Sequence, residues 1–454
     1  MKASKILVAA ALMSLAASGS ALAFHDGGAA YCEGCHTMHN SSGNVAQGKG
    51  ANTTQLKGVN YLLQGSDQSS TCLISGCHAN TAANAKSKVV FTTDAAAGGT
   101  IPASYTPGGD FAWTKETFNW SNSYGGTGTS KGERHGHNIV ATDLGLSADS
   151  TLLTSPGGNY PAANLACSSC HDPHGKFRIV DAAGTVQRPV VGALTGATDV
   201  NKSLPISASG SYGAMPSATE AVGVYRLLAG QGYLPDSVSG VAGITAFGAS
   251  PPYAVVNSSY NRKETTTDTR VAYGTGMSEW CSNCHGGIHN SSASLDAGTS
   301  FLHPASSDSK LGATVLGNYN AYVASANFTN TVATAYTSLV PFEEGTNDRS
   351  ALAAHAVTNG SVTTGADANS NVMCLSCHRA HASGWDSMTR WNNKSEFLTV
   401  AGAYPGVGVA AEGGYGQYNN GKTQAEIQAT FYDRPATSFA TYQRSLCNKC
   451  HAKD

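Results

Sequence analysis

Cysteine pairs followed by histidine are the residues of this sequence most able to do chemistry. The 12 cysteines form six pairs, and a histidine follows the second cysteine of each pair. Five pairs read C-x-x-C-H, and the sixth, CLISGCH, reads C-x4-C-H. This is the attachment signature of a c-type haem, in which the cysteines bond the porphyrin and the histidine binds iron. The predicted attachment cysteines are Cys32, Cys35, Cys72, Cys77, Cys167, Cys170, Cys281, Cys284, Cys374, Cys377, Cys447 and Cys450. The predicted proximal ligands are His36, His78, His171, His285, His378 and His451.

Paired cysteines have two other common uses. An exported protein often forms disulfides, and paired C-x-x-C runs often bind zinc. Neither use requires a histidine directly after every second cysteine. Cysteines at i and i+3 lie on one face of a helical turn, so both can reach one edge of a porphyrin, and the next residue can bind iron. The pattern therefore favours six covalently bound haems.

A second histidine follows four of the six motifs at a distance of three or four residues. These histidines are His39, His174, His289 and His381. Each lies about one helical turn from its proximal histidine, so the two cannot bind opposite faces of the same porphyrin. Each second histidine is therefore predicted to bind the iron of a different haem. No catalytic residue is predicted, because irons held by two histidines offer no open coordination position.

Two further distal ligands are needed if every iron is to bind two histidines. His135 is the weakest of the remaining histidines. The candidates are His137, His355, His303 and His25, and the sequence leaves open which two of these four complete the set. Because the supply of histidine is sufficient, the sequence predicts six bis-histidine irons.

The elements that must hold these motifs are expected to be short. Residues 1–23 read as a signal peptide, with a basic start, an apolar run and an A-x-A cleavage site, so we expect an exported chain with no membrane span. The gaps between motifs follow no fixed period, and 24–454 is interpreted as one hexahaem unit. Only 12% of residues are charged and 52 are glycine, which predicts a loop-rich multihaem c-type cytochrome with few short helices and minimal strand, wrapped around close-packed haems.

Local patterns predict a helix at 422–434 and a second at 347–357. Strand signals are weak, as in KVVFTT at 88–93. The formal net charge of −2 gives no indication of nucleic-acid binding.

Several longer runs resemble the hexahaem outer-surface c-type cytochromes of metal-reducing Geobacter, whose members form filaments. The densest runs are YCEGCHTMHN, GHNIVA, CSSCHDPHGK, TRVAYGTGMSEWC, VPFEEGT, CLSCHRAHASGWDSMTR and YQRSLCNKCHAKD. The resemblance covers most of the mature chain and is weak at roughly 80–130 and 400–430. The chain departs from the family at its second motif, where the family has the shorter spacing and a histidine just beyond it.

The resemblance implies subunits that polymerise head to tail, so that the haem row continues between chains. It also implies that His39 binds the His378 haem of the adjoining subunit. Other cytochromes, extracellular Fe(III) or Mn(IV) oxides and electrodes are the implied redox partners, at the outer cell surface.

The sequence leaves three functions to distinguish. The first is long-range extracellular electron transfer by an electron-transfer protein rather than an enzyme. The second is a monomeric periplasmic electron shuttle, which fits the motifs equally well but leaves His39 without its role between chains. The third is a multihaem nitrite or hydroxylamine reductase, which needs an iron with an open face, and the sequence contains no C-x-x-C-K motif that would indicate one.

Overall fold

The computed structural model describes residues 35–36, 41–42, 45–46, 62–73, 77–79, 89–93, 101–102, 106–121, 125–173, 179–180, 186–187, 228–252, 254–256, 271–289, 304–324, 340–355, 366–407 and 419–451. The predicted signal peptide, 1–23, lies outside these ranges. So do Cys32, His25, His39, His174 and His303.

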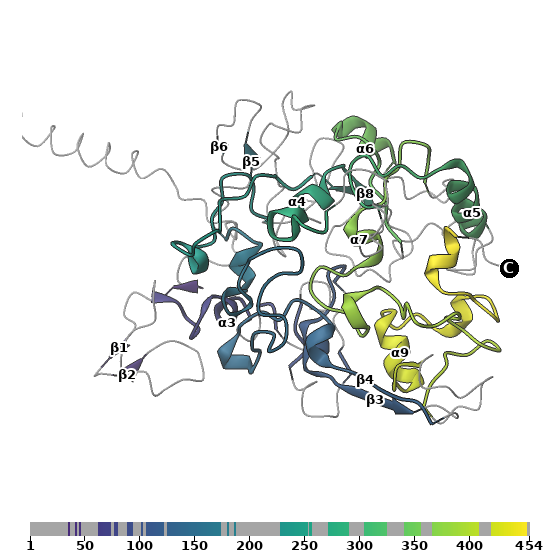
Figure 1. Cartoon of the computed structure of the whole chain (residues 1–454), viewed down its shortest axis with the longest axis horizontal. Helices are drawn as coiled ribbons and strands as arrows, with labels where there is room; N and C mark the ends of the chain where they lie inside the picture. Colours follow the sequence, from purple (N-terminus) through teal and green to yellow (C-terminus); the bar gives the residue numbers. More distant parts are fainter. Residues whose placement is uncertain are drawn as a thin grey trace, which may run out of the picture.

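Regular elements are short and widely separated in the described part of the chain (Figure 1). The α-helices are α3 (Gln68–Cys72), α4 (Met277–His285), α5 (Ala313–Ala324), α6 (Arg349–His355), α7 (Cys374–Cys377) and α9 (Gln424–Thr430). Single 3-10 turns are η4 (Phe111–Lys115), η5 (Gly132–Arg134), η6 (Thr142–Leu144), η7 (Ala162–Asn164), η8 (Cys167–Ser169), η10 (Asp236–Val238), η12 (Asp386–Met388), η13 (Ala436–Ser438) and η14 (Leu446–Lys449). The loop-rich prediction is confirmed.

The described strands pair as small two-stranded antiparallel sheets. They are β1 (Ser41–Ser42) with β2 (Val45–Ala46), β3 (Phe118–Ser121) with β4 (Thr127–Ser130), β5 (Ile179–Val180) with β6 (Val186–Gln187), and β7 (Ala254–Val256) with β8 (Val271–Tyr273). The weak strand signal at 88–93 contributes an isolated bridge between Phe91 and Ala79. No helix in the described ranges has both the length and the apolar character needed to cross a bilayer.

Both predicted helices form, in shortened versions. The helix predicted at 422–434 is α9, which begins at a capping box in which Thr423 and Glu426 bond each other's backbone N–H groups. It ends early because Tyr432 and Asp433 adopt left-handed backbone conformations, with φ of 57° and 60°, which a helix cannot continue through. The helix predicted at 347–357 is α6.

Apolar side chains form several separate clusters rather than one core, and most of these clusters contact motif cysteines. The largest contains Trp385, Trp391 and Phe431 and packs against Cys377 and Cys450. Because the cysteines lie at the edges of the clusters, the haem-attachment positions lie where protein packing ends.

A second cluster, with Leu73 and Phe111, packs against Cys167. A third, with Met277 and Met373, packs against Cys170 and Cys281. The early part of the chain, with β1, β2 and α3, lies toward one end of the long axis of the molecule, and α5 and the C-terminus lie toward the other (Figure 1).

Candidate functional site

Helical turns carry the described attachment motifs. Cys281, Cys284 and His285 lie on α4, and Cys374 and Cys377 are the two ends of α7. The third motif begins on η8 and the sixth on η14. In both, the histidine N–H donates to the carbonyl of the first cysteine, at 3.0 Å, which closes the turn.

The motif cysteines of consecutive motifs lie against each other. The thiols of Cys72 and Cys167 are hydrogen-bonded, and this bond raises the pKa of Cys72, with burial and then the nearby Cys35 adding to it. The thiols of Cys281 and Cys374 form a second such pair, which raises the pKa of Cys281.

The remaining neighbours in the series are also close. Burial raises the pKa of Cys170, and the next cause is the thiol of Cys284. Burial likewise raises the pKa of Cys377, followed by the thiols of Cys447 and Cys450. Motifs one to six are therefore neighbours in the order in which the chain presents them.

Two pairs of imidazoles lie opposite each other at similar separations of their ring centroids. The ring centroids of His171 and His381 are 6.3 Å apart, and those of His137 and His285 are 6.1 Å apart. A metal ion that binds one nitrogen of each ring at about 2 Å would leave roughly 6 Å between the centroids. Each pair therefore has the spacing that an iron between its two imidazoles would require.

The tautomers of several of these imidazoles are fixed by backbone carbonyls. Nδ1 of His137 lies 2.7 Å from the carbonyl oxygen of Ala380, and Nδ1 of His285 lies 2.9 Å from that of Pro156. When Nδ1 carries the proton and donates it to a carbonyl, Nε2 is left as the metal ligand. In the same way, Nδ1 of His378 lies 2.8 Å from the carbonyl oxygen of Ser387.

A backbone strap ties the two distal histidines together. The N–H of His137 donates to the carbonyl of His381 at 2.9 Å, and the N–H of His381 donates to that of Gly108 at 2.8 Å. Glycine is required here because a Cβ on Gly108 would lie 2.7 Å from Nδ1 of His381, and one on Gly136 would lie 2.5 Å from the Cβ of Ala382. The strap therefore holds both imidazoles in fixed positions.

Burial suits these side chains to neutral ligation. It lowers the pKa of His137 to about 4 and that of His381 to about 3, so both rings are neutral at pH 7 and Nε2 keeps its lone pair. Part of each side chain nevertheless stays exposed, although Phe111 stacks on one side of the His381 ring. Their depth, neutrality and spacing fit a porphyrin iron between each pair.

His135 plays a different part from its neighbour His137. Its side chain is fully buried, and its two ring nitrogens lie 2.9 Å from the carbonyl oxygen of Trp113 and 2.7 Å from the hydroxyl of Ser130. A ring with both nitrogens engaged is a structural histidine. This agrees with its low rank among the sequence candidates.

The structure does not bring His289 and His355 to another imidazole among the described residues. Nε2 of His289 lies 3.6 Å from Glu279, and Nδ1 of His355 lies 2.8 Å from Glu344. The proximal His378 likewise has no imidazole opposite it in the part of the chain that the structure describes. His36, His78 and His451 also lie within the described ranges.

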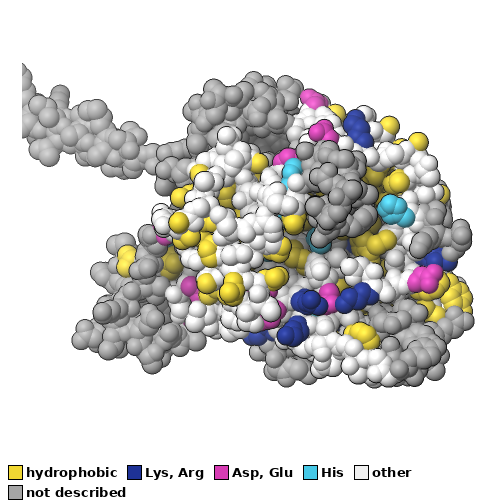
Figure 2. Space-filling model, in the orientation of Figure 1, with side chains coloured by type: hydrophobic (Ala, Val, Ile, Leu, Met, Phe, Trp, Pro, Cys, Tyr) yellow, Lys and Arg dark blue, Asp and Glu magenta, His cyan; other side chains and the backbone are white. Residues whose placement is uncertain are grey.

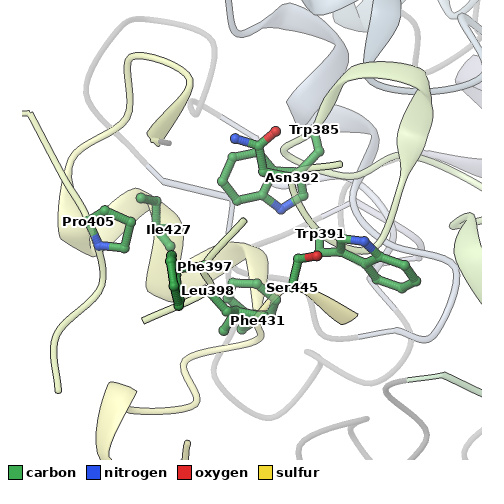
Figure 3. Close-up of a pocket in the computed structure, with 9 residues that line it drawn as sticks. All are labelled: Trp385, Trp391, Asn392, Phe397, Leu398, Pro405, Ile427, Phe431 and Ser445. Atoms are coloured by element: carbon green, nitrogen blue, oxygen red, sulfur yellow. The ribbon is translucent and has the colours of Figure 1, made fainter. Parts of the chain in front are cut away.

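Sequence reasoning missed two supporting residues. The buried carboxylate of Glu343 accepts the N–H groups of Gly276 and Met277, at 3.1 and 2.9 Å, and so caps the N-terminus of α4. The indole N–H of Trp391 donates to Sγ of Cys447 at 3.3 Å. Trp391 also lines a small hollow bordered by nine residues, mostly apolar (Figure 3). Glu343 lies within VPFEEGT, one of the runs that resemble the family, and that resemblance is the signal that could have pointed to it.

Comparisons with known proteins identify relatives over the whole length of the chain. No family model matches the sequence. The chain is 50% identical over 464 residues to the C-type cytochrome OmcS of Geobacter sulfurreducens, and the match covers 100% of this chain and 99% of that protein.

Two solved structures are also similar to this chain. The cryo-EM structure of OmcS nanowires from Geobacter sulfurreducens has a TM-score of 0.73 and 47% identity, covering 95% of this chain and 100% of the other. The structure of an outer membrane cytochrome S filament from the same organism has a TM-score of 0.72 and 46% identity, with the same coverage.

Proposed function

We propose that this chain, which belongs to the OmcS family of c-type cytochromes, carries electrons over long distances as one subunit of an extracellular filament. Its six attachment motifs bind six c-type haems, which supply the redox chemistry while the protein sets their spacing and potential. It is an electron-transfer protein rather than an enzyme. Extracellular acceptors such as Fe(III) or Mn(IV) oxides fit this role.

The facing imidazoles are the observation that carries the proposal. His171 with His381, and His137 with His285, close both axial positions of the third and fourth irons. An iron closed on both sides cannot bind a substrate, so these two positions are suited to electron transfer and unsuited to a reductase. The contacts between consecutive motif cysteines support one continuous row, from the first motif to the sixth.

Residues of the chain orient the ligating imidazoles and keep them neutral. Carbonyls of Ala380, Pro156 and Ser387 orient the ligating imidazoles, and burial keeps the distal rings neutral. The early segments and the C-terminus lie toward opposite ends of the molecule (Figure 1), which supports head-to-tail assembly into a homopolymer.

We further propose that His39 binds the His378 haem of the next subunit. His378 is the described proximal ligand of the fifth motif, and no imidazole faces it within the described ranges of its own chain. The family resemblance supplies the partner. His174, His289, His303, His355 and His25 remain the candidates for the other distal positions.

The test is His39→Ala in the mature, haem-loaded protein, with Asn40→Ala as the matched control. We expect wild type and the control to form filaments in electron micrographs, and the His39 variant to remain as subunits that bind one carbon monoxide in the ferrous state. Filaments and six low-spin haems in the His39 variant would exclude the link between chains. A wild-type protein that stays monomeric would instead support the periplasmic shuttle.

A further inference from the structure

Three cations form an exposed patch beside the fifth motif. Lys131, Arg134 and Lys394, the basic patch, come from η5 and from the loop after η12. The side chains of Arg134 and Lys394 are 62% and 48% exposed, and Lys131 is also exposed. Lys and Arg side chains gather in a short row on the face drawn in Figure 2. Such a concentration stands out in a chain with only 12% charged residues.

The carboxylates within the patch neutralise it only in part. Asp386 lies 2.7 Å from Nζ of Lys394 and 3.8 Å from Nη1 of Arg134, so one nearly buried carboxylate serves two cations. The carboxylate of Glu133 accepts hydrogen bonds from Ser150 and Thr151, and it is also close enough to Lys131 for that charge to help lower its pKa. Three cations therefore share two carboxylates, and one excess positive charge remains on the surface.

The patch adjoins the predicted site of a link between subunits. Asp386 directly precedes Ser387, and the carbonyl of Ser387 fixes the imidazole of His378 at 2.8 Å. Through this link the basic patch lies next to the ligand whose iron the proposed function assigns to His39 of the neighbouring copy.

The segment that contains His39 has the opposite charge. Residues 24–48 contain Asp26 and Glu33 and no lysine or arginine. Glu33 is six residues from His39, a separation that an extended chain spans over at most about 20 Å. Its carboxylate can therefore reach cations that border the His378 site while His39 occupies that site.

We propose that the basic patch docks residues 24–40 of the next copy of this chain, with Asp26 and Glu33 facing Lys131, Arg134 and Lys394. This rests on the proposed filament and adds the surface that guides its assembly. Exposed ion pairs contribute little to affinity, but complementary charge speeds association, selects the register and makes both depend on salt.

The experiment compares charge reversals in haem-loaded protein purified as subunits. The patch variant is Lys131→Glu with Arg134→Glu and Lys394→Glu, and the segment variant is Asp26→Lys with Glu33→Lys. We expect each to slow filament elongation at least tenfold at low salt, as followed by light scattering and electron microscopy. Combining both sets restores attraction, so elongation returns to near the wild-type rate. Wild-type elongation also slows as the salt concentration rises from 20 to 300 mM.

Milder substitutions keep the result interpretable if the reversed patch fails to fold. Lys131 makes no ion pair with Asp386, so Lys131→Gln with Lys394→Gln leaves the pair between Arg134 and Asp386 in place, and we expect elongation slowed about threefold.

Three outcomes overturn the docking inference. Elongation of the patch variant at the wild-type rate shows that the patch does not guide assembly. Failure of the combined variant to recover shows that the two surfaces do not meet. A shifted haem potential with unchanged elongation assigns the patch to haem propionates. In all three, wild type still forms filaments, so the proposed function stands; wild type without filaments contradicts that function instead.

Discussion

Gly108 offers the sharpest test of the distal ligand at the third haem. Its Cα faces the ring of His381, and an added methyl group would lie 2.7 Å from Nδ1, 2.9 Å from Cε1 and 3.0 Å from Cγ. Ordinary contacts with a methyl carbon begin at roughly 3.4 Å. Gly108→Ala therefore forces the ring and the backbone apart by about 0.7 Å.

Hydrogen bonds hold the backbone of Gly108, and a stacked ring holds the imidazole of His381. The carbonyl of Gly108 accepts two N–H groups, from His381 at 2.8 Å and from Ala382 at 3.3 Å, and each such bond contributes about 1 kcal/mol. Phe111 stacks on the imidazole, with centroids 4.8 Å apart, so the ring is also held on a second side. A movement of 0.7 Å is about a third of a metal–nitrogen bond of about 2 Å. We therefore expect the axial bond to be the contact that is lost.

Carbon monoxide reports the loss directly, because it binds ferrous haem only where an axial position is open. We expect the Gly108→Ala protein to bind one equivalent per six haems and the wild type to bind none. Gly248→Ala is the matched control, since a Cβ there meets no atom within 4 Å. Six low-spin haems in Gly108→Ala, with stability lowered by the ~1–3 kcal/mol typical of overpacking, would refute the assignment of His381.

Three further perturbations follow from the described contacts. His137→Ala is expected to open the fourth iron to one carbon monoxide. His135→Ala is expected to leave all irons closed and to lower the unfolding free energy by about 2–4 kcal/mol, because the buried partners of His135 lose their hydrogen bonds. Carbon monoxide binding by the His135 variant and not by the His137 variant would contradict both roles. Burial raises the pKa of Glu343 to about 7, above the ordinary value of about 4.3. Between pH 4 and 7 the folded chain therefore keeps a proton that the unfolded chain has lost. As a result, the free energy of unfolding of the wild type falls over this range by at most about 3.5 kcal/mol. Glu343→Gln is expected to flatten that part of a thermal-melting profile against pH, and an unchanged slope would contradict the cause. Burial lowers the pKa of Lys422 to about 7, so wild-type stability rises as pH rises from 7 toward 10; Lys422→Met is expected to raise the melting temperature more at pH 6 than at pH 10, and equal changes would argue against a buried charge.

Attachment chemistry was predictable from the sequence because it is local. Two cysteines and a histidine within one turn need no tertiary information, and the resulting turns are present at α4, α7, η8 and η14. The loop-rich fold was also predictable, since glycine and the low charge content disfavour long amphipathic elements.

Partner assignment was not predictable in the same way. Spacing showed that His381 could not share an iron with His378, but it could not select His171, because that choice depends on how 106–110 and 380–382 pack together. The sequence left four histidines open for two positions. The tertiary structure separates two of them, because His137 lies opposite an imidazole and His355 lies against a carboxylate.

The contacts that support the ligands leave the weakest trace in the amino-acid sequence. Carbonyls that orient imidazoles, such as those of Pro156 and Ser387, belong to every residue and carry no side-chain signature. Glu343 caps a helix that begins 66 residues earlier, at Met277, so no local capping pattern marks it.

The strap between His137 and His381 has a mechanical consequence. If His381 and His137 bind the third and fourth irons as proposed, heat or tension that separates their two segments would break both coordination bonds in a single event. The two haems in the middle of each subunit would then lose their distal ligands together. A thread of such subunits would lose conduction in whole-subunit steps, while its covalent porphyrin attachments stay intact and allow recovery when the load is removed.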